Sequence, residues 1–457
     1  MATDIYAQSS IQISAGPFFH AEPPVFSMRA VHFDLKGLPP YPERLLEWLH
    51  IAAAARYNVV VVEWEDTFPW EFDKRVRGEL CYTHETIREF HRTAGELGIE
   101  VIPLVQSLGH LEMILRHPGY EHLREVPSRG DAINPLAPGG RELIQSMIDE
   151  VLELTPNLHH FHLGGDEAWC FGSHPETKAF IEKHSKAELF LNYYRPLLDH
   201  LINRSIRPIL WHDMMHQWDT DALRNIGGKA DLMAWGYQGH PDTTDTHFAT
   251  RYLERFMEAG VSVWGSTAFR GGDGFDLDVP DPTARRENAE GWVTVGSRLG
   301  FKGLIATGWS RYGSDGVQCY PFEAALDMLA MQGVLFHDGR APADCLTVLS
   351  NTGGVIYFEQ MQPILKKFQY HRGVAWNLIR QIRTYRATPE VDPRRDTHWL
   401  GTHLLANMDT QLKLLIPIAV EVVKALETST TAHFAQQYVR ERMAPLEQER
   451  ACLQDGE

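Results

Sequence analysis

Short apolar runs alternate with longer amphipathic stretches along the first three quarters of the chain. Segments such as 42–57, 84–98, 140–154 and 246–260 have the apolar spacing of helices. The apolar runs between them are rich in Val, Ile and Leu and cover residues 27–34, 58–64, 99–105, 159–165, 206–213, 230–236, 261–266 and 302–309. Continuous apolar strands are typical of a parallel sheet covered by helices on both faces. The pattern therefore predicts an α/β fold, a (β/α)8 TIM barrel over residues 1–335.

A doubly wound open sheet is the alternative arrangement of alternating strands and helices. Such a sheet needs a glycine-rich phosphate loop after its first strand. The segment SMRAVHFDLKGLPP (27–40) contains no such loop. The barrel is therefore the preferred interpretation.

The strand pattern fades after about residue 335, and residues 336–457 are predicted to form a helical C-terminal appendage. Residues 359–386 and 404–429 have helical apolar spacing, and prolines such as Pro389 and Pro417 interrupt this region. The apolar faces of these helices are expected to pack on the barrel or to form a homodimer. The sequence leaves both arrangements open.

Composition and charge exclude several classes of partner. The net charge of -17 argues against nucleic acid and anionic membranes, which both require a basic face. No window approaches the ~18 uninterrupted apolar residues of a membrane helix, and residues 1–16 do not resemble a signal peptide. The five cysteines are scattered and odd in number, which indicates reduced thiols and a cytoplasmic location. Cys170 is a conceivable nucleophile, but packing is the preferred interpretation because no His–Cys pairing is evident.

Polar and aromatic residues gather where the predicted strands end, which is where barrel enzymes place their active sites. Tryptophan faces cover the apolar face of a sugar ring, while carboxylates and arginines bind its hydroxyls. Any single tryptophan could belong to the core, but their accumulation at strand ends favours a sugar pocket. The strand-end residues are Arg29, His32, Asp34, Glu63, Glu65, Asp66, Gln106, His110, His162, Asp166, Glu167, Trp211, Asp213, Trp235, Tyr237, Arg270, Trp309, Arg311 and Tyr312.

The adjacent acids Asp166 and Glu167 are the sharpest of these features. Neighbouring side chains in a regular strand face opposite ways, so both can enter one pocket only beyond the strand, after Gly164–Gly165. Two acids held close repel each other, so one should keep a proton near neutral pH. That proton would serve as the general acid of glycoside cleavage. A pair of acids can also simply cap the following helix.

At this point the sequence resembles family 20 of the glycoside hydrolases, whose fourth strand ends in His/Phe-x-Gly-Gly-Asp-Glu. The similarity extends to the hexosaminidase D branch of that family and covers approximately residues 25–330. The motifs that carry it are EWEDTFPW (63–70), PLVQSLGHLE (103–112), HLGGDEAW (162–169), MAWGY (233–237) and TGWSRY (307–312).

The resemblance implies substrate-assisted retention of configuration, in which the substrate's own 2-acetamido oxygen attacks the anomeric carbon. Glu167 would protonate the leaving oxygen and then activate water, and Asp166 would hold the acetamido N–H. Tyr237 would donate to the acetamido oxygen. No metal or other cofactor is implied.

The resemblance also assigns residues that bind the substrate, a small glycan or glycoconjugate. Trp211, Trp235 and Trp309 would form the walls of the sugar pocket. The remaining assignments are Arg29 for the ring hydroxyls, His110 for support of the acid pair or the sugar, and Arg311 with Tyr312 for the pocket or the leaving-group side.

The chain departs from the larger, secreted members of the family at two strand ends. Trp309-Ser310-Arg311 stands where they carry Trp-x-Glu, and STAFRGGDG (266–274) replaces their Tyr-x-Asp. In those members, the residues at these positions bind the sugar 4-hydroxyl, whose orientation differs between gluco and galacto sugars. The hexosaminidase D resemblance leans toward N-acetylgalactosaminides.

Three further interpretations remain beside this one. The run His159-His160-x-His162 could suggest a metal site, but strand alternation separates its side chains and no second ligand cluster follows. A retaining glycosidase with a direct carboxylate nucleophile would also fit the barrel. A non-catalytic sugar-binding barrel is the third possibility.

Overall fold

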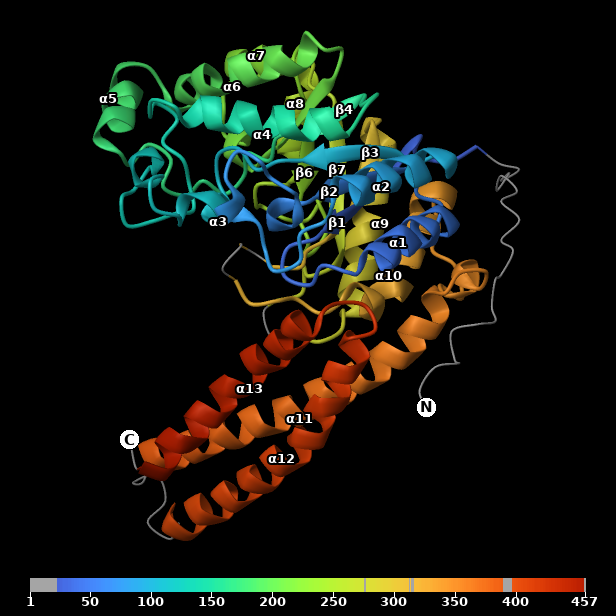
Figure 1. The fold of residues 1–457 in the computed structure, drawn as a ribbon, viewed down its shortest axis with the longest axis vertical. Helices are drawn as coiled ribbons and strands as arrows, with labels where there is room; N and C mark the ends of the chain where they lie inside the picture. Colours follow the sequence, from blue (N-terminus) through green and yellow to red (C-terminus); the bar gives the residue numbers. More distant parts are fainter. Residues whose placement is uncertain (1–22, 275–276, 312, 314–315, 389–396, 456–457) are drawn as a thin grey trace.

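The computed structural model describes residues 23–274, 277–311, 313, 316–388 and 397–455. Eight parallel strands close into a barrel in sequence order, and β1 pairs with β8 through Met28 and Gly303. Figure 1 shows helices surrounding these strands. The predicted (β/α)8 barrel is therefore confirmed. Its strands are β1 (Met28–Asp34), β2 (Val59–Glu63), β3 (Glu100–Leu104), β4 (His160–His162), β5 (Arg207–Trp211), β6 (Asp231–Trp235), β7 (Val263–Arg270) and β8 (Gly303–Gly308).

Most strands are apolar along their middle because both of their faces are buried. Val59 and Val61 of β2 point into the barrel, where they join Ile102, Trp211 and other inward side chains. Val60 and Val62 belong instead to the larger core between the sheet and the helices. Alternation along each strand thus fills two separate cores, as expected for this architecture.

The helices that cover the barrel begin at residues suited to cap them. The Thr83 side chain accepts from the Thr86 amide at the start of α2, and Ser185 accepts from Glu188 at the start of α6. The barrel helices are α1 (Pro42–Ala54), α2 (His84–Glu96), α4 (Gly140–Leu154), α6 (Lys186–Ile202), α7 (Thr220–Gly227), α8 (Thr250–Glu258), α9 (Pro282–Leu299) and α10 (Leu326–Asp338), with α3 (Glu112–Leu115) and α5 (Pro175–Lys183) in connecting segments.

The C-terminal region is a bundle of three helices, α11 (Gly354–Ala387), α12 (Thr397–Leu426) and α13 (Ala432–Asp455). Figure 1 shows the bundle projecting from one side of the barrel. Its apolar residues form a core of their own, to which Leu38, Val279 and Ala324 of the barrel also belong. The apolar faces therefore pack on one another and on the barrel. The boundary expected near residue 335 falls inside α10, and the bundle begins at Gly354.

One buried carboxylate joins the bundle to the barrel. Asp278, in the connection between β7 and α9, pairs with Arg372 of α11 and Arg442 of α13, both at 2.6–2.7 Å. Arg442 also donates to the backbone oxygen of Gln318, which lies beyond β8. The bundle is thereby tied to the connections that follow the last two barrel strands. Within the described residues, none of the helices is both long and apolar enough to span a membrane.

Candidate active site

The Asp166–Glu167 pair lies at the carboxyl end of β4, on a turn made by two glycines. Gly164 and Gly165 have φ values of 60° and 91°, in the left-handed region that glycine adopts most easily. A Cβ on Gly164 would come within 2.0 Å of the Gln106 side-chain oxygen. The Gly164 amide donates to Nδ1 of His162 at 2.9 Å, which fixes the start of the turn. The turn brings both acids to one site, as the sequence predicts.

His110 faces both acids from the connection after β3. Its Nε2 lies 3.5 Å from Oδ2 of Asp166 and 3.4 Å from Oε2 of Glu167. Burial alone would lower the pKa of His110, but the neighbouring carboxylates, Asp166 above all, raise it well above its usual value. The imidazolium is therefore the counter-charge of the acid pair.

His110 and Glu167 both have left-handed backbones, with φ values of 55° and 48°. Such conformations are strained for residues other than glycine and cluster at functional sites. Gly109 explains how the two segments approach each other, because a Cβ there would meet the backbone oxygen of Asp166 at 2.2 Å. The strain is concentrated at the acid pair and its counter-charge.

A third carboxylate, Asp213, lies behind the pair. It begins the short helical turn Asp213–Met215 after β5 and is 8% exposed. The Glu167 amide donates to its Oδ2 at 3.0 Å, and the Trp235 indole donates to its Oδ1 at 3.2 Å. Burial and the adjacent Asp166 raise the pKa of Asp213 to about 7.

An aromatic wall adjoins the acids. Trp235 and Tyr237 stack with centroids 5.5 Å apart, and the Trp309 centroid lies 6.3 Å from Tyr237 and 6.0 Å from Trp211. These four residues follow or end strands β5, β6 and β8. The structure thus brings together Tyr237 and the three tryptophans that the sequence singled out, and Trp211 is fully buried.

Several polar atoms of this site are buried without a hydrogen-bond partner among the described residues: Oδ1 of Asp166, the hydroxyl of Tyr237 and the indole nitrogens of Trp211 and Trp309. Thr307 and Trp309 approach the Tyr237 hydroxyl, but neither meets hydrogen-bond geometry. Burying such groups unpaired is costly, and the cost is removed when a ligand supplies the partners. The site has one unpaired acceptor on Asp166 and an unpaired hydroxyl on Tyr237.

A charged floor lies between β1 and β2, beneath Trp309. The Lys36 ammonium lies 3.0 Å from Asp34 and from Glu63, and 5.4 Å from the centroid of the Trp309 ring. Burial alone would raise the pKa of Glu63, but Lys36 lowers it below its usual value. Gln106 donates to Glu63 at 3.1 Å. Sequence reasoning missed Lys36, although its position two residues after β1 was a usable signal.

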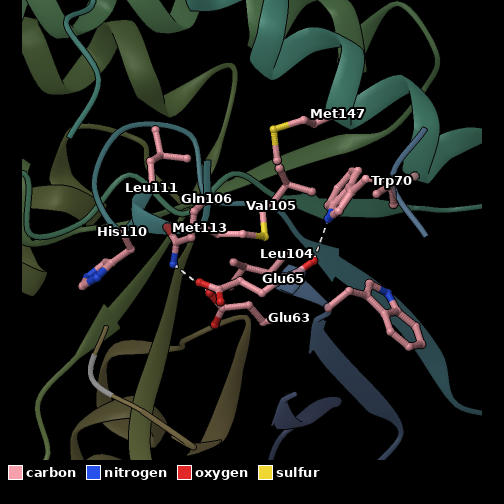
Figure 2. Close-up of a pocket in the computed structure, with 12 residues that line it drawn as sticks. Glu63, Glu65, Trp70, Leu104, Val105, Gln106, His110, Leu111, Met113 and Met147 are labelled. Atoms are coloured by element: carbon pink, nitrogen blue, oxygen red, sulfur yellow. Dashed lines mark hydrogen bonds between the residues drawn. The ribbon is translucent and has the colours of Figure 1, made fainter. Parts of the chain in front are cut away.

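A narrow cavity opens on the other side of Glu63 and His110. Most of its lining is apolar and comes from Trp64, Trp70, Leu104, Val105, Leu111, Met113, Met147 and Val151. Figure 2 shows the imidazole of His110 turned away from this apolar lining, and the Trp70 indole bonded to the backbone of Glu65. The lining of this cavity therefore includes neither the acid pair nor the aromatic wall.

Known proteins have sequences similar to this chain. The catalytic domain of glycosyl hydrolase family 20 matches residues 53–250. The chain is 30% identical to hexosaminidase D of Homo sapiens over 422 residues, 90% of this chain and 86% of that protein. It is 32% identical to hexosaminidase D of Bos taurus over 324 residues, 68% of this chain and 93% of that one. The chain belongs to glycoside hydrolase family 20.

A solved structure shows a similar fold. The β-N-acetylhexosaminidase of Bacteroides fragilis NCTC 9343 superposes with a TM-score of 0.54 at 17% identity, covering 74% of this chain and 72% of that one. At that identity the likeness concerns the fold alone. The family assignment rests on the sequence relatives.

Arg29 does not take part in the family 20 site, contrary to the prediction. It is the second residue of β1, and its guanidinium donates to the backbone oxygens of Arg56 and Phe26, both at 2.8 Å. The start of a parallel strand lies at the opposite end of the barrel from the catalytic end. Arg29 therefore stabilises the end of the barrel at which the strands begin, opposite the catalytic end.

Arg311 lies at the rim, between the barrel and the bundle. A Cβ on Gly37 would touch its side chain, and its guanidinium lies 3.9 Å from Glu441 of α13. Its charge also acts on the partly buried Asp66. Arg311 is thus beside the charged floor, whereas Tyr312 lies outside the described residues.

The structure also describes the histidines and the cysteine that the sequence raised as alternatives. Within the described part of the chain, no group of three or more His, Cys, Asp or Glu side chains is arranged to hold a metal ion. Burial raises the pKa of the Cys170 thiol, which disfavours the nucleophilic thiolate. His160 turns to Glu100 at the start of β3, at 2.6 Å, whereas Nδ1 of His162 accepts from the Gly164 amide.

Proposed function

We propose that this enzyme is a retaining exo-β-N-acetylhexosaminidase that removes terminal β-linked N-acetylgalactosamine, N-acetylglucosamine or both. The observation that carries the proposal is the pair of buried, unpartnered groups beside Glu167, namely Oδ1 of Asp166 and the hydroxyl of Tyr237. A 2-acetamido group offers one N–H donor and one carbonyl acceptor, which complement this acceptor and this hydroxyl.

The reaction begins with cleavage of the glycosidic bond. The acetamido oxygen attacks the anomeric carbon, the bond from that carbon to the leaving oxygen breaks, and Glu167 transfers its proton to that oxygen. The product on the enzyme is an oxazolinium ion. Asp166 accepts the amide N–H and balances the positive charge, while Tyr237 donates to the attacking oxygen and orients it.

Hydrolysis of the oxazolinium ion restores the enzyme. Water adds to the anomeric carbon on the face that the leaving group vacated, and its proton passes to Glu167. The bond between the anomeric carbon and the acetamido oxygen breaks, so the configuration is retained. His110 faces both acids and keeps the local charge balanced through both steps.

The walls and the floor bind the rest of the sugar. Trp211, Trp235 and Trp309 enclose the apolar faces of the ring and the acetamido methyl. The floor offers Lys36, Asp34 and Glu63 as partners for ring hydroxyls, at the place where Arg29 was expected to act. These residues are the candidates for the choice between galacto and gluco sugars.

Paired substrates test this function. Wild-type enzyme is expected to hydrolyse 4-nitrophenyl N-acetyl-β-galactosaminide or its glucosaminide counterpart, and an N-acetyl thiazoline mimic of the oxazolinium ion is expected to inhibit. Glu167→Gln should lose nearly all activity on poor leaving groups, and Asp166→Asn should also be impaired. Equal turnover of a substrate without the acetamido group would exclude the mechanism.

Two outcomes would favour the alternatives. Trapping of the enzyme by a 2-fluoro sugar would indicate a direct carboxylate nucleophile, because the substrate-assisted route forms no ester with the enzyme. Sugar binding without turnover by the wild type would indicate a non-catalytic barrel.

We propose the cytoplasm as the enzyme's location. Supporting this, all five cysteines are free thiols in the structure, as is usual in a reducing compartment. Cell fractionation with thiol labelling before lysis tests it. Recovery in a secreted fraction with blocked thiols would contradict it.

A further inference from the structure

We infer that Asp213 is a positioning residue that fixes the general acid Glu167 and the Trp235 wall relative to each other. This inference rests on the proposed function, because it assigns a role in the same site. Asp213 lies outside the motif HLGGDEAW (162–169) that contains the acid pair, and it is not part of the aromatic wall.

The hydrogen bonds of Asp213 connect three strand ends. Asp213 follows β5, Glu167 follows β4 and Trp235 ends β6. Each carboxylate oxygen accepts one N–H, from the Glu167 amide at 3.0 Å and from the Trp235 indole at 3.2 Å. One rigid carboxylate thus sets the distance between the acid and the wall that holds the sugar.

Glu167 needs such support because of its backbone. Its φ of 48° costs about 1–2 kcal/mol for a residue with a Cβ. Its carbonyl accepts from the Trp169 amide at 2.7 Å, and its amide is held by Asp213. The side chain itself is 31% exposed, so the backbone contacts determine where the carboxyl points. Loss of the Asp213 contact would free the strained residue to relax.

The charge of Asp213 also acts on the acid cluster. Asp166 and Glu167 face it from the end of β4, Tyr194 faces it from α6, and His216 contacts its backbone oxygen. His110 is the cation that faces Asp166 and Glu167. Three carboxylates therefore share little positive charge, which favours retention of a proton in the cluster. Removing the negative charge of Asp213 would make it easier for the remaining carboxyl groups of the cluster to lose a proton.

Leaving-group dependence distinguishes a misplaced acid from a general loss of structure. A poor leaving group, such as the sugar of a disaccharide, needs protonation by Glu167, whereas 2,4-dinitrophenolate leaves without it. Asp213→Asn keeps the size of the side chain but offers a single acceptor oxygen. We expect its kcat to fall by about 100-fold on a disaccharide and by less than about threefold on the dinitrophenyl glycoside. The alkaline limb of the pH–kcat profile should move to lower pH.

Asp231→Asn is the matched control. Asp231 is also buried, at 1% exposure, and also accepts from an indole, that of Trp264 at 3.2 Å. It begins β6, at the opposite end of the barrel. This variant should lower the unfolding midpoint without changing the leaving-group dependence or the pH profile of the folded enzyme.

The outcomes are distinct. Equal losses on both substrates, or an unchanged pH profile in Asp213→Asn, would overturn the inference while leaving the proposed function intact. No turnover of either N-acetylhexosaminide by the wild type would overturn the proposed function itself. If Asp213→Asn does not fold, Asp213→Glu keeps the charge but displaces the carboxylate. It should then show the leaving-group bias without the pH shift, and absence of the bias would count against the inference.

Discussion

The Tyr237 ring stacks on Trp235 at a centroid distance of 5.5 Å, with the two planes 23° apart. The stack holds the tyrosine through its ring, while its hydroxyl is buried without a hydrogen-bond partner among the described residues. Removing the hydroxyl of Tyr237 should therefore leave the position of its ring unchanged. This makes Tyr237 the most direct test of how the acetamido group is activated.

Tyr237→Phe should lower kcat by about 100-fold, because one donor to a developing charge is removed from a preorganised site. The unfolding midpoint should not fall, since the ring stack remains and an unpaired hydroxyl disappears. Steady-state kinetics and thermal unfolding measure the two effects. A variant with wild-type kcat would remove Tyr237 from the mechanism.

Trp169→Ala should weaken recognition of the leaving sugar. Trp169 is 72% exposed, and its amide donates to the Glu167 carbonyl at 2.7 Å, so it stands beside the acid that faces the leaving group. An exposed aromatic face at this place suits stacking with a sugar. We expect kcat/KM to fall about tenfold for a disaccharide but little for a methyl glycoside, at roughly 1.4 kcal/mol for each factor of ten. Trp399→Ala, an exposed tryptophan on the bundle, is the control and should change neither value.

The stability of the protein should fall as the pH drops below about 6.5. Burial lowers the pKa of His162 to about 3, and its Nδ1 must stay unprotonated to accept from Gly164. Because the folded pKa is depressed, the unfolded chain binds more protons between pH 3 and 6.5. The free energy of unfolding therefore decreases on acidification, by at most about 1.4 kcal/mol per pH unit for this group.

Urea unfolding of wild type and His162→Gln at pH 7, 6 and 5 measures this effect. The variant should show a shallower dependence on pH, because glutamine does not titrate. Burial also lowers the pKa values of His91 and His247 to about 4, so some dependence should remain. Parallel curves for the two proteins would refute the assignment to His162.

Asp278→Asn should destabilise the protein and impair catalysis together. Asp278 is fully buried and is the shared partner of Arg372 and Arg442, so its loss leaves two buried cations with weakened pairing. Breaking a buried ion pair costs about 3–5 kcal/mol. Denaturant unfolding and kcat/KM are the measurements. Arg92→Gln removes two surface ion pairs on α2 and should leave both measurements unchanged.

Much of the barrel was predictable because each strand is buried on both faces and so appears as an apolar run. The acid pair was predictable because the glycines before it mark a turn beyond a strand. The error at Arg29 arose from the family resemblance, although its place at the start of the first run already assigned it to the opposite end of the barrel. Lys36 was overlooked although it lies just past the same strand, at the catalytic end of the barrel. Its pairing with Glu63 depends on the register of β1 and β2.

Contacts between distant segments could not be predicted from the sequence pattern. Asp213 was recognised as a strand-end residue, but its bond to the Glu167 amide depends on the register of β4 and β5. The pairing of Asp278 with Arg372 and Arg442 depends on how the bundle docks. Local spacing carries no information about either arrangement.

The link between Gln318 and α13 has a consequence for biosynthesis. The Gln318 amide donates to Glu441, a residue 123 positions later in the chain. A ribosome that adds about 5–20 residues per second reaches α13 several seconds after the last barrel strand has been made. The barrel can close during that interval, but the connection after β8 has no bundle to hold it. Newly made chains should thus become competent for catalysis later than they become compact.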